Sequence, residues 1–380
     1  MAKNAETAQP AASLEMPHSG RNYGIDLLRV VAIFQVLMLH TLGRGNVLGS
    51  VGYGSAQYKF AWLLEMGAFG ATDIFALISG YVSYTDKEKK VNFANYIVLW
   101  LQVLFYSVGV TLWFKLLHPD WVTPLDQIQM FFPVTFELYW YFTAYTGVFM
   151  LMPVLNAGVR HCSQRSARKL FVLMIAVFSF YATVSQRFMF SNGYSFPWIL
   201  ICYVLGALMK RGNIGGKMKA YQAGLGIVIC WVITWAWKLY GPELSFWGLY
   251  VGKGHAEMYM APSVLIGSIF YVIGFSKLRI PHKAEKVVSF FAAGSFAAYI
   301  LNCHKFVYTN WLGYKFSYLG GRSLAEIALH SVGFSLLFLT GAVLLDHARS
   351  GLFRVLRVRK LADGIVSLAR GRAGKGDLDA

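Results

Sequence analysis

The stretch GIDLLRVVAIFQVLMLHTL, residues 24–42, decides the fold class of this chain. It is mostly apolar over the length that a helix needs to cross the hydrocarbon core of a bilayer, roughly 20 residues. Similar blocks recur along most of the 380 residues, of which 56% are hydrophobic and only 14% charged. A soluble domain carries about a quarter of charged residues. The sequence therefore predicts an all-α fold, a polytopic membrane helical bundle.

About ten such blocks can be placed along the chain, with boundaries that are good to a few residues. The sixth block is short. The second contains Glu65 and Asp73, so we expect it to face the bundle interior. The predicted transmembrane helices cover residues 24–42, 60–84, 93–117, 138–156, 169–187, 196–210, 219–239, 257–276, 287–309 and 326–346.

The distribution of Lys and Arg supports this number of helices. With a cytoplasmic N-terminus, the inside segments carry 25 of the 35 basic residues and the outside loops nine, while Arg29 lies within the first block. This bias follows the positive-inside rule. Because the loss of one helix would reverse the side of every later loop, the bias predicts an even number of crossings. Both termini are then cytoplasmic.

Composition also excludes several functional classes. The net charge of +17 does not indicate nucleic-acid binding, since the basic residues sit in short loops rather than on one soluble face. The four cysteines show neither zinc-site nor disulfide spacing, and we expect no metal.

Residues 1–20 lack the apolar run of a signal peptide and are expected to form a disordered cytoplasmic tail. We expect a membrane domain over 21–346 and a basic cytoplasmic tail over 347–380.

Three ionisable residues lie in the first block, and such residues inside a membrane are functional candidates because they are costly. Asp26, Arg29 and His40 share one helix face at 100° per residue. Arg29 and His40 lie about 16 Å apart along the axis. Asp26 and Arg29 can form a structural ion pair, and His40 can be a structural histidine. An imidazole can also act as a general base on a hydroxyl.

Further polar candidates follow in later blocks. Asp73 lies within the membrane and needs a partner, while the glycines around it permit close helix packing. Glu137 precedes the aromatic residues Trp140 and Tyr141, which are typical of an interfacial belt. The ninth block contains NCHK, residues 302–305, and we expect His304 and Lys305 near the same outer side as His40 and Glu137.

Four motifs follow one another along the chain: Arg29 with ten residues before His40, Asp73-Ile74-Phe75 with Ser79-Gly80, Trp140-Tyr141-Phe142 leading to Pro153, and Ser295 with Tyr299 and His304. Taken in this order, they resemble the membrane acyltransferase 3 family over roughly residues 21–346. The chain looks like the stand-alone type that acylates surface polysaccharides, but it carries Lys89 and Lys90 where many relatives have arginines.

The resemblance implies transfer of an acyl group, most often acetyl, from cytoplasmic acyl-CoA to a hydroxyl of a cell-surface or lipid-linked glycan. It implies a multi-pass protein in the plasma (inner) membrane of a bacterium, with acetyl-CoA or another acyl-CoA as donor and no metal. The expected partners are membrane lipids and the glycan acceptor, and the chain can also associate with a second copy of itself or with other glycan-synthesis proteins.

Roles for individual residues come with this resemblance. His40 would take the proton of the attacking hydroxyl, and Asp26 would orient Arg29. Asp73 or Glu137 would orient His40. Arg29, Lys89 and Lys90 would bind the donor. The expected acceptor-binding or oxyanion residues are Ser79, Trp140, Tyr141, Asn302, His304 and Lys305.

Two other interpretations remain open from the residues. A transporter or flippase of lipid-linked saccharides would line its pathway with the same intramembrane charges. A structural partner in a glycan-synthesis complex would use them only to pair helices.

Overall fold

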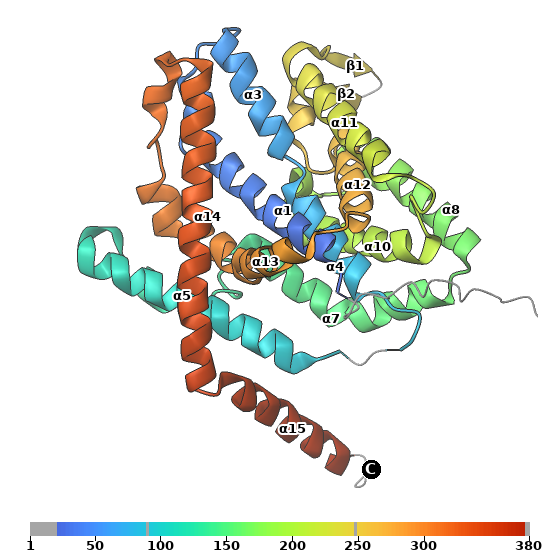
Figure 1. Cartoon of the computed structure of the whole chain (residues 1–380), viewed down its shortest axis with the longest axis vertical. Coiled ribbons are helices and arrows are strands. Elements are labelled where there is room, and N and C mark those ends of the chain that lie inside the picture. Colours follow the sequence, from blue (N-terminus) through green and yellow to red (C-terminus); the bar gives the residue numbers. More distant parts are fainter. Residues whose placement is uncertain (1–20, 89–90, 247–248, 377–380) are drawn as a thin grey trace, which may run out of the picture.

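Figure 1 shows the computed structural model, which describes residues 21–88, 91–246 and 249–376 as a helical bundle. A two-stranded antiparallel hairpin joins two of the helices, with Leu244 opposite Val251. The elements are α1 (Tyr23–Leu42), α2 (Val47–Ser50), α3 (Ala56–Ala68), α4 (Ala71–Ser83), α5 (Phe93–Leu117), α6 (Pro124–Gln129), α7 (Trp140–His161), α8 (Gln164–Ile175), α9 (Ala182–Ser185), α10 (Phe196–Gly212), α11 (Ala220–Tyr240), β1 (Leu244–Phe246), β2 (Leu249–Val251), α12 (Pro262–Ser276), α13 (His282–Cys303), α14 (Leu324–Val355) and α15 (Val358–Gly376).

The prediction of an all-α polytopic membrane bundle is confirmed. Within the described residues, nine helical segments are long and apolar enough to cross a membrane. The remaining predicted crossing is α10, whose 17 residues reflect the short sixth block.

Loops that were predicted to be cytoplasmic meet at one end of the bundle. Arg211 bonds to Asp86 at 3.1 Å and to the backbone oxygen of Cys162 at 2.8 Å. Lys277 donates to the backbone oxygen of Gly216 at 3.0 Å. We call this the basic end. The alternation of the loops agrees with ten crossings, and the side of the membrane that the basic end faces stays a prediction.

Three predicted blocks differ from the observed helices. The second is split into α3 and α4 at Gly70, since glycine is a poor helix former. The ninth ends at Cys303, and a π-helical turn, Phe306–Trp311, follows. The tenth continues to Val355, so the boundary expected after residue 346 lies within α14.

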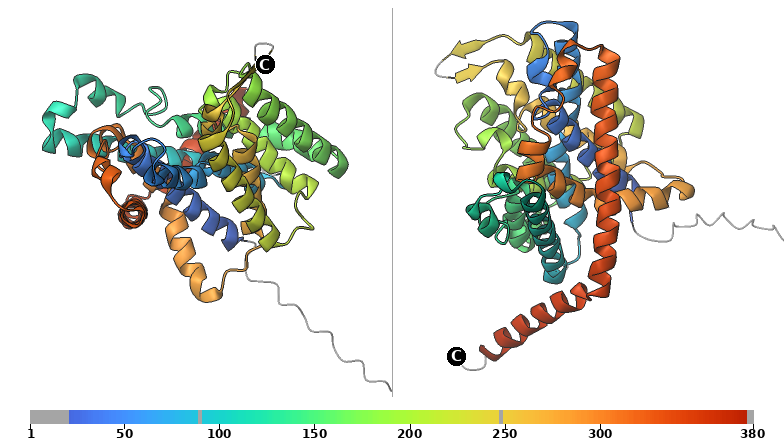
Figure 2. Two further views of the ribbon diagram at one scale, coloured as in Figure 1. Left: turned by 90° about the horizontal axis from the view of Figure 1, so that it is seen from above. Right: turned by 90° about the vertical axis from the view of Figure 1, so that its left-hand side faces the viewer.

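After α14 the chain turns into α15, which leaves at an angle and packs partly on α5 (Figure 2). Leu361, Ile365 and Leu368 are exposed on one face of α15. This amphipathic pattern is typical of a helix that lies at a membrane surface.

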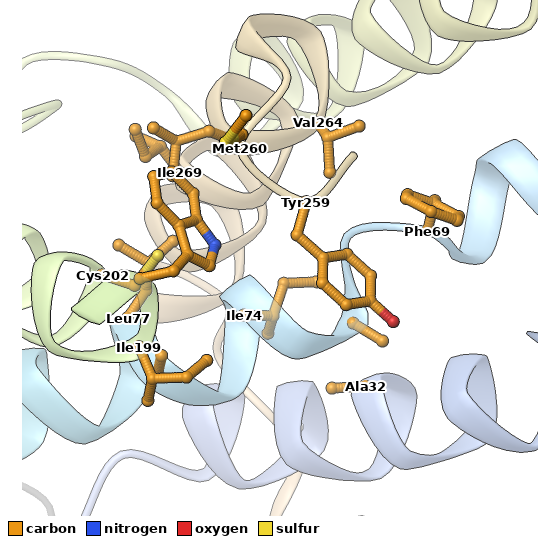
Figure 3. Packing of buried hydrophobic residues seen from close by; sticks show 14 of the residues in the cluster. Ala32, Phe69, Ile74, Leu77, Ile199, Cys202, Tyr259, Met260, Val264 and Ile269 are labelled. Atoms are coloured by element: carbon orange, nitrogen blue, oxygen red, sulfur yellow. The ribbon is translucent and has the colours of Figure 1, made fainter. Parts of the chain in front are cut away.

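The buried core lies where α1, α4, α10 and α12 meet, and Figure 3 shows Ala32, Ile74, Leu77 and Ile199 packed there. Two glycines let α4 and α10 touch. A Cβ at Gly80 would lie 1.8 Å from the backbone oxygen of Tyr203, and one at Gly206 would lie 2.1 Å from that of Leu77. This close contact fixes α4, whose other side faces the candidate site.

Candidate active site

A cavity of about 870 Å³ lies between α1, α3, α4, α5, α7 and α13. Arg29 lines it toward the basic end, and His40 lines it about three turns further along α1. Both residues line the same cavity, as their helical spacing predicts. A volume of this size suits a small-molecule substrate.

At the basic end, Arg29 is held by an ion pair. Its guanidinium donates to one carboxylate oxygen of Asp26, and Arg21 donates to the other. Asp26 lies in the first turn of α1, where a negative charge is favoured. The ion pair expected between Asp26 and Arg29 is therefore present.

Ser79 also lines the cavity, but its hydroxyl donates to the backbone oxygen of Phe75 at 2.8 Å.

At the other end, His40 is held by an amide. Its Nδ1 contacts the side-chain oxygen of Asn302, which is buried on α13. Because that oxygen can only accept, Nδ1 carries the hydrogen and Nε2 keeps its lone pair. Among the described residues Nε2 has no hydrogen-bond partner, and Tyr308 packs edge-on against the ring at 4.8 Å. His40 thus presents a proton acceptor to the cavity.

Glu137, Trp140 and Tyr141 also line the cavity. The backbone of Glu137 is left-handed, with a φ of 51°, which is uncommon for a residue other than glycine. No hydrogen bond joins Glu137 to His40 in the described part of the chain. The side chain that contacts the His40 ring in this geometry is Asn302.

Asp73 lies away from the cavity. The indole N–H of Trp198 donates to one of its carboxylate oxygens at 2.8 Å, and the thiol of Cys202 lies 3.9 Å from the same oxygen. Both partners come from α10. The geometry gives Asp73 a role in joining α4 to α10, and it does not bring this carboxylate to His40.

His304 and Lys305 are likewise outside the cavity and line a separate pocket of about 20 Å³. His304 lies 3.2 Å from the hydroxyl of Thr111. Lys305 donates to Asp126 at 2.6 Å. Burial opposes charge on Asp126, but hydrogen bonds from Lys305 and Thr123 hold the pKa of this carboxyl below its usual value. Lys305 is therefore occupied by an ion pair rather than turned toward a substrate.

The two lysines expected to bind the donor, Lys89 and Lys90, lie outside the described residues. The structure therefore does not place them relative to Arg29.

A family model described as an acyltransferase domain matches residues 22–347. The chain belongs to the membrane acyltransferase 3 family. No match was found among curated proteins or among solved structures. The motif residues of this acyltransferase that reach the cavity are Arg29, His40, Phe75, Ser79, Trp140, Tyr141, Phe142, Ser295 and Tyr299.

Several residues that line the cavity of this acyltransferase were not singled out in the sequence. Tyr308 lies in the π-helical turn after α13, and Tyr194 and Tyr259 lie in loops. Glu65 was noted only as a charge within an apolar block. No local pattern marks these residues, because separate segments bring them to the cavity through long-range packing.

Proposed function

We propose that this membrane acyltransferase moves an acyl group, usually acetyl, from acyl-CoA to a hydroxyl of a cell-surface or lipid-linked glycan. The donor enters from the basic end, which is cytoplasmic, and the acceptor reacts at His40. The setting is the plasma membrane of a bacterium.

The observation that carries the proposal is that one cavity contains both a fixed cation and a proton acceptor. Arg29 and His40 are about 16 Å apart along α1, and both line it. A donor whose phosphates stay at the basic end can thus reach toward a base deep in the bundle. The cations of the basic end favour the approach of an anionic nucleotide.

His40 supplies the chemistry of this step. The attacking hydroxyl gives its proton to Nε2 as its oxygen bonds to the acyl carbon. The carbon–sulfur bond then breaks, and the proton passes from His40 to the departing CoA thiolate. Asn302 holds the imidazole with the acceptor nitrogen toward the cavity throughout. The same residues also suit a route in which the acyl group rests briefly on His40.

Arg29 suits the donor. Its guanidinium is held from one side by Asp26, and the residue lines the cavity on another. Hydrogen bonds from such a planar cation stabilise a phosphate or a polarised thioester oxygen. Arg29 therefore positions the donor so that the thioester lies near His40.

The test is NMR of the surface glycan from cells that carry the wild-type gene, His40→Ala, His330→Ala or no gene. His330 is the matched control, since it is exposed and bonded to Tyr318. We expect O-acyl signals with wild type and His330→Ala, and none in the other two, at equal amounts of membrane-inserted protein.

An identical acylation pattern in all four strains would contradict the proposal. If the glycan also became scarcer at the surface without the gene, the result would favour a flippase. Full acylation with His40→Ala alone would remove this histidine from the reaction.

A further inference from the structure

Glu65 is a buried carboxyl that has no hydrogen-bond partner in the described part of the chain. It lies on α3, is 8% exposed and lines the cavity. Its Oε2 is buried, and neither oxygen has a hydrogen-bond partner among the described residues. The nearby Glu257, in contrast, is paired with Lys238. An unsatisfied polar group in a membrane interior is costly, and a ligand that donates hydrogen bonds removes that cost.

Glu65 lies in the same part of the cavity as His40. Two residues further along α3, the backbone oxygen of Gly67 accepts from Gln35 at 3.1 Å, which ties α3 to the segment of α1 that carries His40. Both Glu65 and His40 line this cavity together with Tyr308. A ligand that fills the cavity can therefore contact Glu65 and the base together.

Aromatic rings cover the adjoining wall. The ring of Tyr259 lies 5.0 Å from that of Phe69, and Figure 3 shows the two side by side. Tyr194 lies 4.6 Å from Tyr259 and 5.2 Å from Trp140. Such faces pack against the C–H face of a sugar ring while their polar edges remain available for hydrogen bonds. Apolar walls with a few convergent polar groups are typical of ligand sites.

The hydrogen-bonding groups of Glu65 narrow the ligand class. A carboxyl oxygen accepts hydrogen bonds, so Glu65 suits a ligand that offers hydroxyl donors. A neutral sugar with neighbouring hydroxyls meets both requirements, since it offers O–H donors and an apolar ring face.

We propose that Glu65 binds a hydroxyl of a neutral sugar acceptor, next to the hydroxyl that reacts at His40, with Tyr194 and Tyr259 packing on the ring. This inference rests on the proposed transfer to a glycan and adds the subsite and the class of sugar.

The test is steady-state kinetics of the purified full chain in lipid nanodiscs. The donor is acetyl-CoA, and the acceptor is the total glycan extracted from cells that lack the gene. For Glu65→Gln we expect at least a tenfold rise in the KM for glycan and a change below twofold in the KM for acetyl-CoA. Glu257→Gln is the matched control, because it makes the same substitution outside the cavity. Neither of its KM values should change.

An unchanged glycan KM with Glu65→Gln, or an equal rise in both KM values, would overturn the inference. No transfer by the wild type would instead refute the proposed function. If Glu65→Gln fails to insert, Tyr194→Ala decides, since Tyr194 is half exposed. Its glycan KM should also rise selectively, and an unchanged value would overturn the inference.

Discussion

The two ends of the cavity hold their key residues in different ways. Arg29 is held by the charged Asp26, whose other oxygen accepts from Arg21. His40 is held by the neutral amide of Asn302. A carboxylate secures a permanent cation at one end, whereas an amide fixes the tautomer of an imidazole without adding charge. The comparison teaches that one end holds a permanent cation, which suits an anionic group, and that the other end holds a proton acceptor.

Asn302→Leu is the strongest challenge to this comparison. It removes the acceptor that keeps the hydrogen on Nδ1, so we expect kcat to fall by about 10²-fold, in the range of a lost general base. The KM for acetyl-CoA should stay the same. The measurement is steady-state transfer from acetyl-CoA to extracted glycan.

Asn302→Asp serves as the companion variant, because it keeps a hydrogen-bond acceptor at the same place. It should retain clearly more activity than Asn302→Leu. If the two variants were equally active, the contact with His40 would be structural only.

Arg29→Lys probes the opposite end. Lysine keeps the charge but loses the planar set of donors. We expect the KM for acetyl-CoA to rise about tenfold, which corresponds to about 1.4 kcal/mol. Arg21→Lys is the matched control, since Arg21 contacts the same Asp26 but does not line the cavity. Equal effects of the two changes would mean that the ion pair, and not contact with the donor, sets the KM.

Trp198→Phe should have the smallest effect on the comparison. It removes the N–H that donates to Asp73, so we expect the free energy of unfolding to fall by about 1 kcal/mol. Thermal unfolding in detergent measures this loss. Both KM values should stay at wild-type levels. A selective change in one of them would link Asp73 to that end of the cavity.

Sequence patterns were sufficient to predict most of the helices and the shared face of Arg29 and His40 on the first one. The spacing of Arg29 and His40 within one apolar block predicts their shared face, and the basic loops predict the alternation of the two ends. Both patterns are local in the sequence, so they can be recognised without knowledge of the fold.

Contacts between residues far apart in the sequence could not be predicted from such local patterns. Asn302 lies 262 positions from His40, and only helix packing brings the two together. His304 was expected near the same site. However, α13 ends at Cys303, and His304 follows it with a non-helical backbone, so its ring lies beside Thr111 rather than in the cavity.

The glycine contact between α4 and α10 limits how this cavity can change during evolution. Any side chain at Gly80 or Gly206 would collide with the backbone of the opposite helix. The position of α4 in the cavity wall is therefore expected to stay the same. New donors or acceptors must then be accommodated by exchanging side chains that line the cavity, such as Ser79 or Val82, while the helix that carries them stays in place.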